Sequence, residues 1–145
     1  MRITKLILLL LILIPVQISR NNTIIDYNTV SEVKIKLLAR LLESECSICP
    51  VSEKKLVGAT VLNRIGHSDF PDNMQDVINQ PNQYALKKIK PSSESLRVAT
   101  QLLINNYRNK KVLYFYKPGH GFKRKNILIK TKYHHYATWL WKITN

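Results

Sequence analysis

LLARLLESECSICP, residues 37–50, contains the end of an amphipathic helix and the break that follows it. At 100° per residue, one face carries Leu38, Leu41, Leu42 and Glu45, at positions i, i+3, i+4 and i+7. Glu43 is predicted to point into water on the other flank, and Pro50 cannot continue the helix. A carboxylate on an apolar stripe is costly unless it is neutralised, paired or placed at the floor of a cleft. The stretch therefore predicts a helix that ends near Glu45 and a carboxyl group with a special environment.

The composition is that of one small basic domain. The chain has 145 residues, 45% of them hydrophobic, which is enough for a single core. Its formal net charge is +14. A chain this basic is expected to bind a polyanion, whether nucleic acid, an anionic membrane face or an anionic cell wall. Charge alone does not choose among these three.

The first nineteen residues, MRITKLILLLLILIPVQIS, are typical of a secretory signal peptide. Arg2 and Lys5 precede an apolar run, residues 6–15, that is shorter than the roughly 20 residues of a membrane span. The residues before Arg20 match a cleavage site poorly, so an uncleaved signal anchor stays open. We expect an exported, extracytoplasmic protein, which counts against nucleic acid as a partner and favours an envelope polymer. Membrane contact is expected only through this N-terminal segment.

The remaining chain is predicted to be a polar linker, residues 20–31, and one domain, residues 32–145. Helices are predicted for residues 31–45 and 52–65, with a turn and a short helix in residues 68–81. A further helix in residues 91–106 should begin after a Ser92 cap and turn Leu96, Ala99 and Leu103 inward. A strand is predicted in KVLYFYK (111–117), and NILIKT (126–131) and YHHYATW (133–139) are predicted to give one or two more short strands. Helices followed by a small antiparallel sheet indicate an α+β domain of lysozyme-like size.

Nine acidic residues make the search for a catalytic carboxylate short. Asp69 and Asp72 flank a proline in a turn, while Glu53 and Glu94 fall in first helical turns, where negative charge suits the helix dipole. Only Glu45 is predicted to lie on an apolar face. Burial raises the pKa of a carboxyl group, which favours a general acid near neutral pH. A structural, salt-bridged glutamate is an equally good interpretation of the pattern alone.

Five segments resemble, in the same order, the cell wall hydrolases of the SleB/CwlJ type, the spore cortex-lytic enzymes and their phage and bacterial relatives. LLARLLESEC resembles the helix that carries the catalytic Glu of that family. The other four segments are VLNR (61–64), FPDNMQDVINQPNQY (70–84), LYFYKP (113–118) and YHHY (133–136). The resemblance spans residues 35–137. It departs from the family where Ile48, Cys49, Lys117 and Lys132 replace the usual residues, which leaves the loop after Glu45 and the substrate subsites open.

The resemblance implies a lysozyme-like α+β fold and an enzyme that cleaves the glycan strand of peptidoglycan, most simply as a lytic transglycosylase. Ordinary glycoside hydrolysis uses two carboxyl groups, whereas a transglycosylase can use Glu45 alone as general acid and base, without metal or cofactor. Residues expected to contact sugars are Asn63, Gln83, Tyr84, Tyr114, Tyr116, His134 and Tyr136. We expect a monomer that binds peptidoglycan and anionic wall polymers and no nucleic acid. The alternative is a non-enzymatic basic module that binds a wall or membrane surface.

Cys46 and Cys49 form a CxxC pair. In an exported protein a disulfide is favoured, ahead of free thiols and well ahead of a metal site. A structural zinc ion needs four ligands, and these cysteines supply two. His134 and His135 could complete the set only if both pointed to one side, and adjacent residues of a strand point to opposite faces.

Overall fold

The computed structural model describes residues 30–109, 112–119 and 126–138. Four helices come first: α1 (Glu32–Cys46), α2 (Val51–Arg64), α3 (Met74–Asn79) and α4 (Ser93–Ile104). Three strands follow: β1 (Tyr114–Tyr116), β2 (Ile127–Lys130) and β3 (His135–Ala137). This order confirms the predicted α+β class. The predicted signal segment and all but the last two residues of the predicted linker lie outside the described residues.

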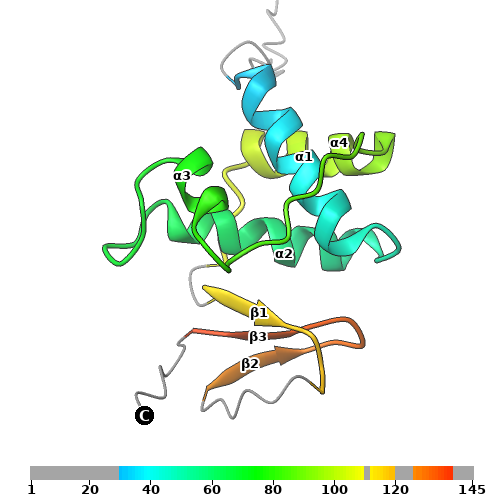
Figure 1. Ribbon diagram of the computed structural model, residues 1–145. Helices are drawn as coiled ribbons and strands as arrows, with labels where there is room; N and C mark the ends of the chain where they lie inside the picture. Colours follow the sequence, from blue (N-terminus) through cyan, green and yellow to red (C-terminus); the bar gives the residue numbers. More distant parts are fainter. Residues whose placement is uncertain (1–29, 110–111, 120–125, 139–145) are drawn as a thin grey trace, which may run out of the picture.

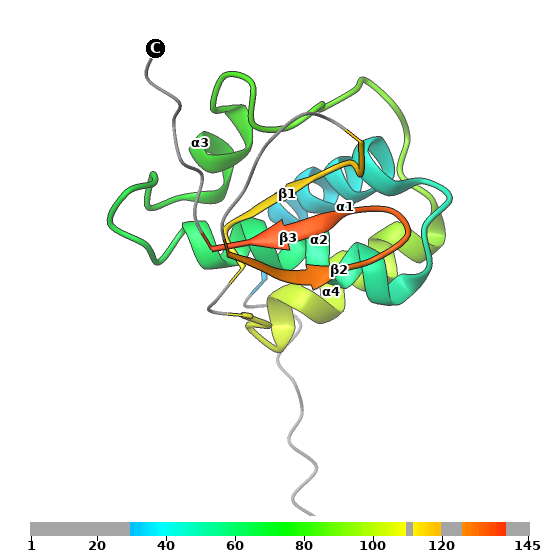
Figure 2. The ribbon, with the colours of Figure 1, turned by 90° about the horizontal axis from the view of Figure 1, so that it is seen from below.

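The helices and the sheet form separate layers. The sheet lies on one side of the molecule and α2 is the helix next to it, with α1 and α4 beyond α2 (Figure 1). Viewed from the sheet side, the three strands lie over α2, and α3 stands to one side (Figure 2). Across the described residues, no helix has the length and apolar character needed to cross a membrane.

The sheet is antiparallel, with the strand order β1-β3-β2. The last strand in the chain is therefore the central one, and Tyr136 pairs with Phe115 on one side and with Ile129 on the other. The strands are shorter than the runs that predicted them. Before β1 the backbone N–H of Val112 donates to the carbonyl of Asn109, so the chain is still turning where the sequence predicted a strand.

The helix ends follow from local signals that the sequence carries. Pro50 directly precedes α2, where its missing N–H costs nothing. The Ser92 hydroxyl caps α4 by accepting a hydrogen bond from the Ser95 N–H, and the Asn73 side chain caps α3 in the same way through Asp76 N–H. The predicted bounds of α1 and α2 are correct to within one residue.

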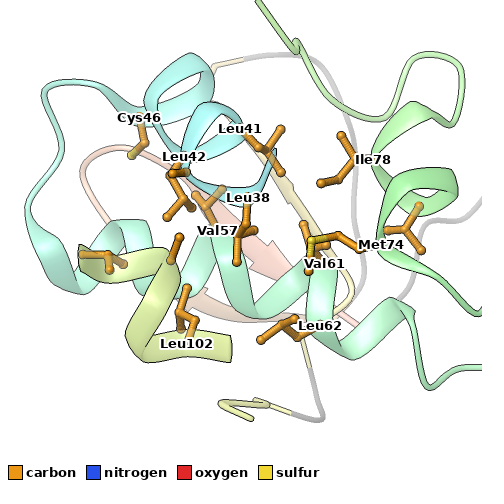
Figure 3. Packing of buried hydrophobic residues seen from close by; sticks show 14 of the residues in the cluster. Leu38, Leu41, Leu42, Cys46, Val57, Val61, Leu62, Met74, Ile78 and Leu102 are labelled. Atoms are coloured by element: carbon orange, nitrogen blue, oxygen red, sulfur yellow. The ribbon is translucent and has the colours of Figure 1, made fainter. Parts of the chain in front are cut away.

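The core lies where α1 crosses α2, with α3 and α4 closing its sides (Figure 3). The apolar stripe predicted for the first helix is confirmed, because Leu38, Leu41 and Leu42 are fully buried. Gly58 lies at the closest approach of α2 to α4: a Cβ atom there would come within 2.3 Å of the Leu102 side chain. Glycine at this position lets the two helices pack closely.

The inner face predicted for α4 is confirmed at Ala99 and was wrong at its other two positions. Its buried residues are Ser95, Val98, Ala99 and Leu102, while the predicted Leu96 and Leu103 are half-buried. The difference arises from a hydrogen bond: the Ser95 hydroxyl donates to the Glu43 carboxylate of α1, and Ser95 therefore faces inward. Turning Ser95 inward rotates the apolar face by one position.

Candidate active site

Glu45 lies in the last turn of α1 and is half-buried. Its Oε1 accepts a hydrogen bond from the backbone N–H of Ala85. Ala85 belongs to the α3–α4 loop (residues 80–92), which crosses the C-terminal half of α1 (Figure 1). The Lys87 N–H of the same loop donates to the Ser44 hydroxyl at 3.0 Å. Helix and loop therefore both orient the Glu45 carboxyl, which stays partly open to solvent.

Arg64, the last residue of α2, is enclosed by three aromatic rings. The guanidinium carbon lies 4.8 Å from the ring centre of Phe70, 4.9 Å from that of Tyr84 and 5.0 Å from that of Tyr114. The side chain is only 3% exposed, and its Nε donates to the carbonyl of Leu113 at 2.8 Å. Cation–π contact favours a desolvated guanidinium over ring faces. Arg64 thus fixes an aromatic cage (Phe70, Tyr84, Tyr114) that joins the α3–α4 loop to β1.

Tyr84 connects this cage to Glu45. Burial raises the pKa of the Tyr84 phenol, and the charges of Glu45 and Tyr114 add to the rise, while Arg64 and a hydrogen bond with Thr60 oppose it. The Thr60 hydroxyl donates to the Val57 carbonyl at 2.7 Å, so its oxygen is left to accept from the Tyr84 hydroxyl, 3.4 Å away. Tyr84 is therefore a neutral phenol held beside the Glu45 carboxyl.

Glu43 does not point into water, contrary to the sequence-based prediction. Its Oε2 accepts hydrogen bonds from the Ser92 N–H at 3.2 Å, the Ser92 hydroxyl at 2.6 Å and the Ser95 hydroxyl at 2.7 Å. Burial alone would raise the pKa of Glu43, but these hydrogen bonds and the charge of Lys54 lower it below its usual value. Glu43 therefore holds the N-terminus of α4 against α1.

Glu53 is a second carboxylate on an inner helix face, and the prediction that Glu45 alone occupies one was wrong. Glu53 is 3% exposed, in the first turn of α2. Its Oε1 lies 2.6 Å from the Tyr136 hydroxyl, 2.9 Å from His134 Nδ1 and 3.0 Å from the Thr131 hydroxyl. Because the carboxylate accepts, the His134 ring carries a proton on Nδ1. This Glu53 cluster joins the start of α2 to the last strand of the sheet.

His134 and Tyr136 are interior residues, at 2% and 0% exposure. Both form a hydrogen bond with the Glu53 carboxylate. The pKa of the Tyr136 phenol is raised far above its usual value, first by burial and then by this carboxylate. Sugar contact predicted for these two residues does not agree with this packing. Phe115 links them to the aromatic cage, since its ring lies 5.0 Å from that of His134 and 6.0 Å from that of Tyr84.

The other predicted substrate residues have different surroundings. The Asn63 amide is buried and donates to the carbonyls of Asn109 and Val112, so it fixes the chain that leads into β1 and offers no donor to a ligand. Tyr116 is half-buried with its ring edge-on to His135. Gln83 is half-buried next to Tyr84. Of the seven predicted residues, Gln83 and Tyr84 directly precede Ala85, whose N–H binds Glu45, and Tyr114 joins Tyr84 in the aromatic cage.

Cys46 and Cys49 form a disulfide directly after Glu45, with their Cα atoms 5.1 Å apart. It spans the turn between α1 and α2, in which the Cys49 N–H donates to the Cys46 carbonyl. The bridge limits the movement of the helix end that carries Glu45. Over the described ranges, no three His, Cys, Asp or Glu side chains are grouped so that they could hold a metal ion.

Sequence reasoning missed Arg64 and Glu53, although each left a signal. Arg64 ends the VLNR segment, from which only Asn63 was selected. Glu53 precedes Val57 by four residues and so lies on the same helix face. The argument that singled out Glu45 on its apolar stripe applies equally to Glu53.

Comparisons with known proteins agree on one family. The family model described as Cell Wall Hydrolase matches residues 50–139, a range that begins just after Glu45. The catalytic domain of the germination-specific lytic transglycosylase SleB from Bacillus anthracis has a similar fold, with a TM-score of 0.64 and 21% identity over 76% of this chain and 98% of that one. The catalytic domain of the Bacillus cereus SleB protein is similar as well, with a TM-score of 0.62 and 20% identity over 74% of this chain and 91% of that one. No curated protein matches the sequence.

Proposed function

The chain belongs to the cell wall hydrolase family, and from this premise we propose that it cleaves the glycan strand of peptidoglycan as a lytic transglycosylase with Glu45 as its general acid and base. The observation that carries the proposal is the position of Glu45. It is a carboxyl group at a helix end, half-buried, oriented by a backbone N–H and adjacent to aromatic side chains. A general acid needs this combination of orientation and access.

The proposed reaction has two proton transfers, both at Glu45. The protonated carboxyl donates to the glycosidic oxygen as the bond to the muramoyl C1 breaks. The carboxylate that remains then takes the proton of the muramoyl C6 hydroxyl, whose oxygen attacks C1. The product is a 1,6-anhydro sugar, and Glu45 regains its proton without water being consumed. A single carboxyl group suffices because the substrate supplies its own nucleophile.

Neighbouring residues have supporting roles in this proposal. Tyr84 and Tyr114 contribute aromatic ring surface for packing against sugars, and Gln83 contributes an amide. Arg64 holds both tyrosine rings in position from behind. Glu53 takes no part in the chemistry, because its carboxylate is enclosed and already accepts three hydrogen bonds. Its contribution is to hold the sheet that bears Tyr114.

The test is analysis by mass spectrometry of the muropeptides released from purified walls. We expect anhydro ends from the wild type and none from Glu45→Gln, which keeps shape but lacks the transferable proton. Loss of a general acid–base group costs about 10²–10⁴ in rate. Glu32→Gln, at the exposed start of the same helix, is the matched control and should release wild-type amounts.

Three outcomes would correct the proposal. Reducing ends in place of anhydro ends would indicate a hydrolase that activates water. An active Glu45→Gln protein would remove Glu45 from the chemistry. Wall binding by the wild type without any released fragment would favour a non-enzymatic binding module.

A further inference from the structure

A pocket of about 590 Å³ opens between the N-terminal half of α1, α3 and the α3–α4 loop. Neither Glu45 nor any residue of the aromatic cage lines it. Its walls come from α1, α3, the α3–α4 loop and the first turn of α4; Arg40, Asn79, Lys90 and Leu96 are one residue from each. We call it the α1–α3 pocket. It is a concave site on the part of α1 that the proposed reaction does not use.

The polar chemistry of the α1–α3 pocket is that of an anion site. Lys36, Arg40 and Lys90 line it, and no carboxylate does among the described residues that form its walls. The Nε of Arg40 is buried and has no hydrogen-bond partner. A buried donor without an acceptor is unfavourable, and Arg40 as a whole is only half-buried, so its guanidinium can turn to meet an anion in the pocket. Lys36 pairs with Glu32, but both side chains are mostly exposed, so the pair can open at little cost.

The pocket is also apolar, which narrows the class of ligand. Leu37 and Leu96 contribute half-buried side chains to its walls. Two of the exposed large hydrophobic residues of the domain belong to it as well, Val33 at 71% and Ile89 at 37% exposure. Exposed apolar side chains beside a pocket indicate a partner that removes them from water. A hydrated wall polymer of sugars or polyol phosphates would neutralise the cations but leave this apolar surface uncovered.

We propose that the α1–α3 pocket binds the phosphate headgroup of an anionic phospholipid. Arg40 hydrogen-bonds the phosphate, Lys36 and Lys90 add charge, and Val33 and Ile89 enter the outer edge of the acyl layer. Charge and apolar area act together in such binding. Sixteen residues, 16–31, separate the apolar N-terminal run from α1. Fully extended they reach at most about 55 Å, so a retained N-terminal segment would keep the pocket close to a membrane.

The test is hydrogen–deuterium exchange on the full-length protein with two kinds of vesicle. One kind contains phosphatidylcholine alone, and the other contains phosphatidylglycerol as well. We expect protection of residues 33–40 and 89–96 with the anionic vesicles only. Because the readout is local, attachment through the N-terminal segment does not obscure it. Arg40→Gln should lose this protection and Lys90→Gln should lose part of it, whereas Lys130→Gln, an exposed cation of β2, should keep it.

Each remaining outcome overturns the proposal in a distinct way. Equal protection by phosphatidylcholine vesicles would show that charge is not recognised. Unchanged protection in Arg40→Gln would show that the pocket is not the binding site. Equal protection by inorganic phosphate would assign the site to a free anion, and equal protection by a glycerol-phosphate polymer would assign it to the wall. Release of wall fragments by Arg40→Gln should stay at the wild-type level, so this test and that of the proposed reaction are independent.

Discussion

The hydroxyl of Tyr136 and the carboxylate of Glu53 lie 2.6 Å apart in the interior, although 83 residues separate them in the chain. One comes from the central strand of the sheet and the other from the first turn of α2. This contact ties the two layers of the domain together. Tyr136 is fully buried, and its hydroxyl donates to a carboxylate. Hydrogen bonds to charged acceptors are stronger than those between neutral groups.

Tyr136→Phe should therefore destabilise the protein by about 1–3 kcal/mol, because it removes one donor from a buried carboxylate and leaves packing intact. Urea unfolding followed by circular dichroism measures the change. Tyr107→Phe, at an exposed tyrosine, is the control and should lie within about 0.5 kcal/mol of wild type. A Tyr136→Phe protein as stable as the control would mean that Glu53 does not rely on this hydroxyl.

Glu43→Gln should lower stability by about 1 kcal/mol at neutral pH, since the carboxylate accepts three hydrogen bonds at the start of α4. The pKa of Glu43 is lowered in the folded protein, so its contribution is present above the ordinary value of 4.5. It is lost as the pH falls through the lower, folded value. The stability difference between variant and wild type should shrink in that acidic window. A stability difference between Glu43→Gln and wild type that does not change with pH in that window would contradict this role. Asp72→Asn is the control and should have the same stability as wild type.

Gly58→Ala tests the close approach of α2 and α4. Alanine would favour the helix by about 1 kcal/mol, but its Cβ overlaps the buried Leu102 side chain, and overpacking costs about 1–3 kcal/mol. We expect a net loss in thermal stability. Leu102→Ala alone should cost about 2–5 kcal/mol through the cavity it leaves. In a protein that already carries Leu102→Ala, Gly58→Ala should be stabilising. If Gly58→Ala instead changed stability equally with and without Leu102→Ala, the clash would be refuted.

The disulfide predicts a simple labelling result. In denaturant, alkylation of the exported protein should modify two cysteines per chain only after reduction, since Cys46 and Cys49 are paired. Denaturant is required because both are buried. Reduction should destabilise the fold by about 2 kcal/mol in the chain-entropy model for so short a loop. Complete labelling without reductant would show that the pair is not formed in the cell.

The helices could be predicted from the sequence because their signals are local. Pro50 and Ser92 mark helix starts by their own chemistry, and the leucine spacing of α1 determines its buried face. The short strands could not be delimited in this way. Their pairing depends on β3 lying between β1 and β2, and β-propensity along the chain does not indicate which residues find a partner.

The candidate site was predictable only in part, for a related reason. Glu45 could be found because its own helix places it on the apolar stripe. Glu43 was expected in water because its helix alone gives no sign that α4 begins against that flank. His134 and Tyr136 were recognised as notable residues, but their partner was Glu53, about 80 positions earlier. Side-chain function depends on packing partners that one helix or strand does not reveal.

The strand order has a consequence for the timing of folding. β1 and β2 each pair with β3 and not with each other, and β3 is the last of the three to be synthesised. A chain emerging from a ribosome or a translocation channel can assemble α1, α2 and α4 first, whereas the sheet must wait for residues 135–137. Until residues 131–137 arrive, the Glu53 carboxylate lacks its partners Thr131, His134 and Tyr136, and the nascent domain has no second layer. Premature termination before His134 would leave a helical fragment with both other strands unpaired, a form open to proteolysis.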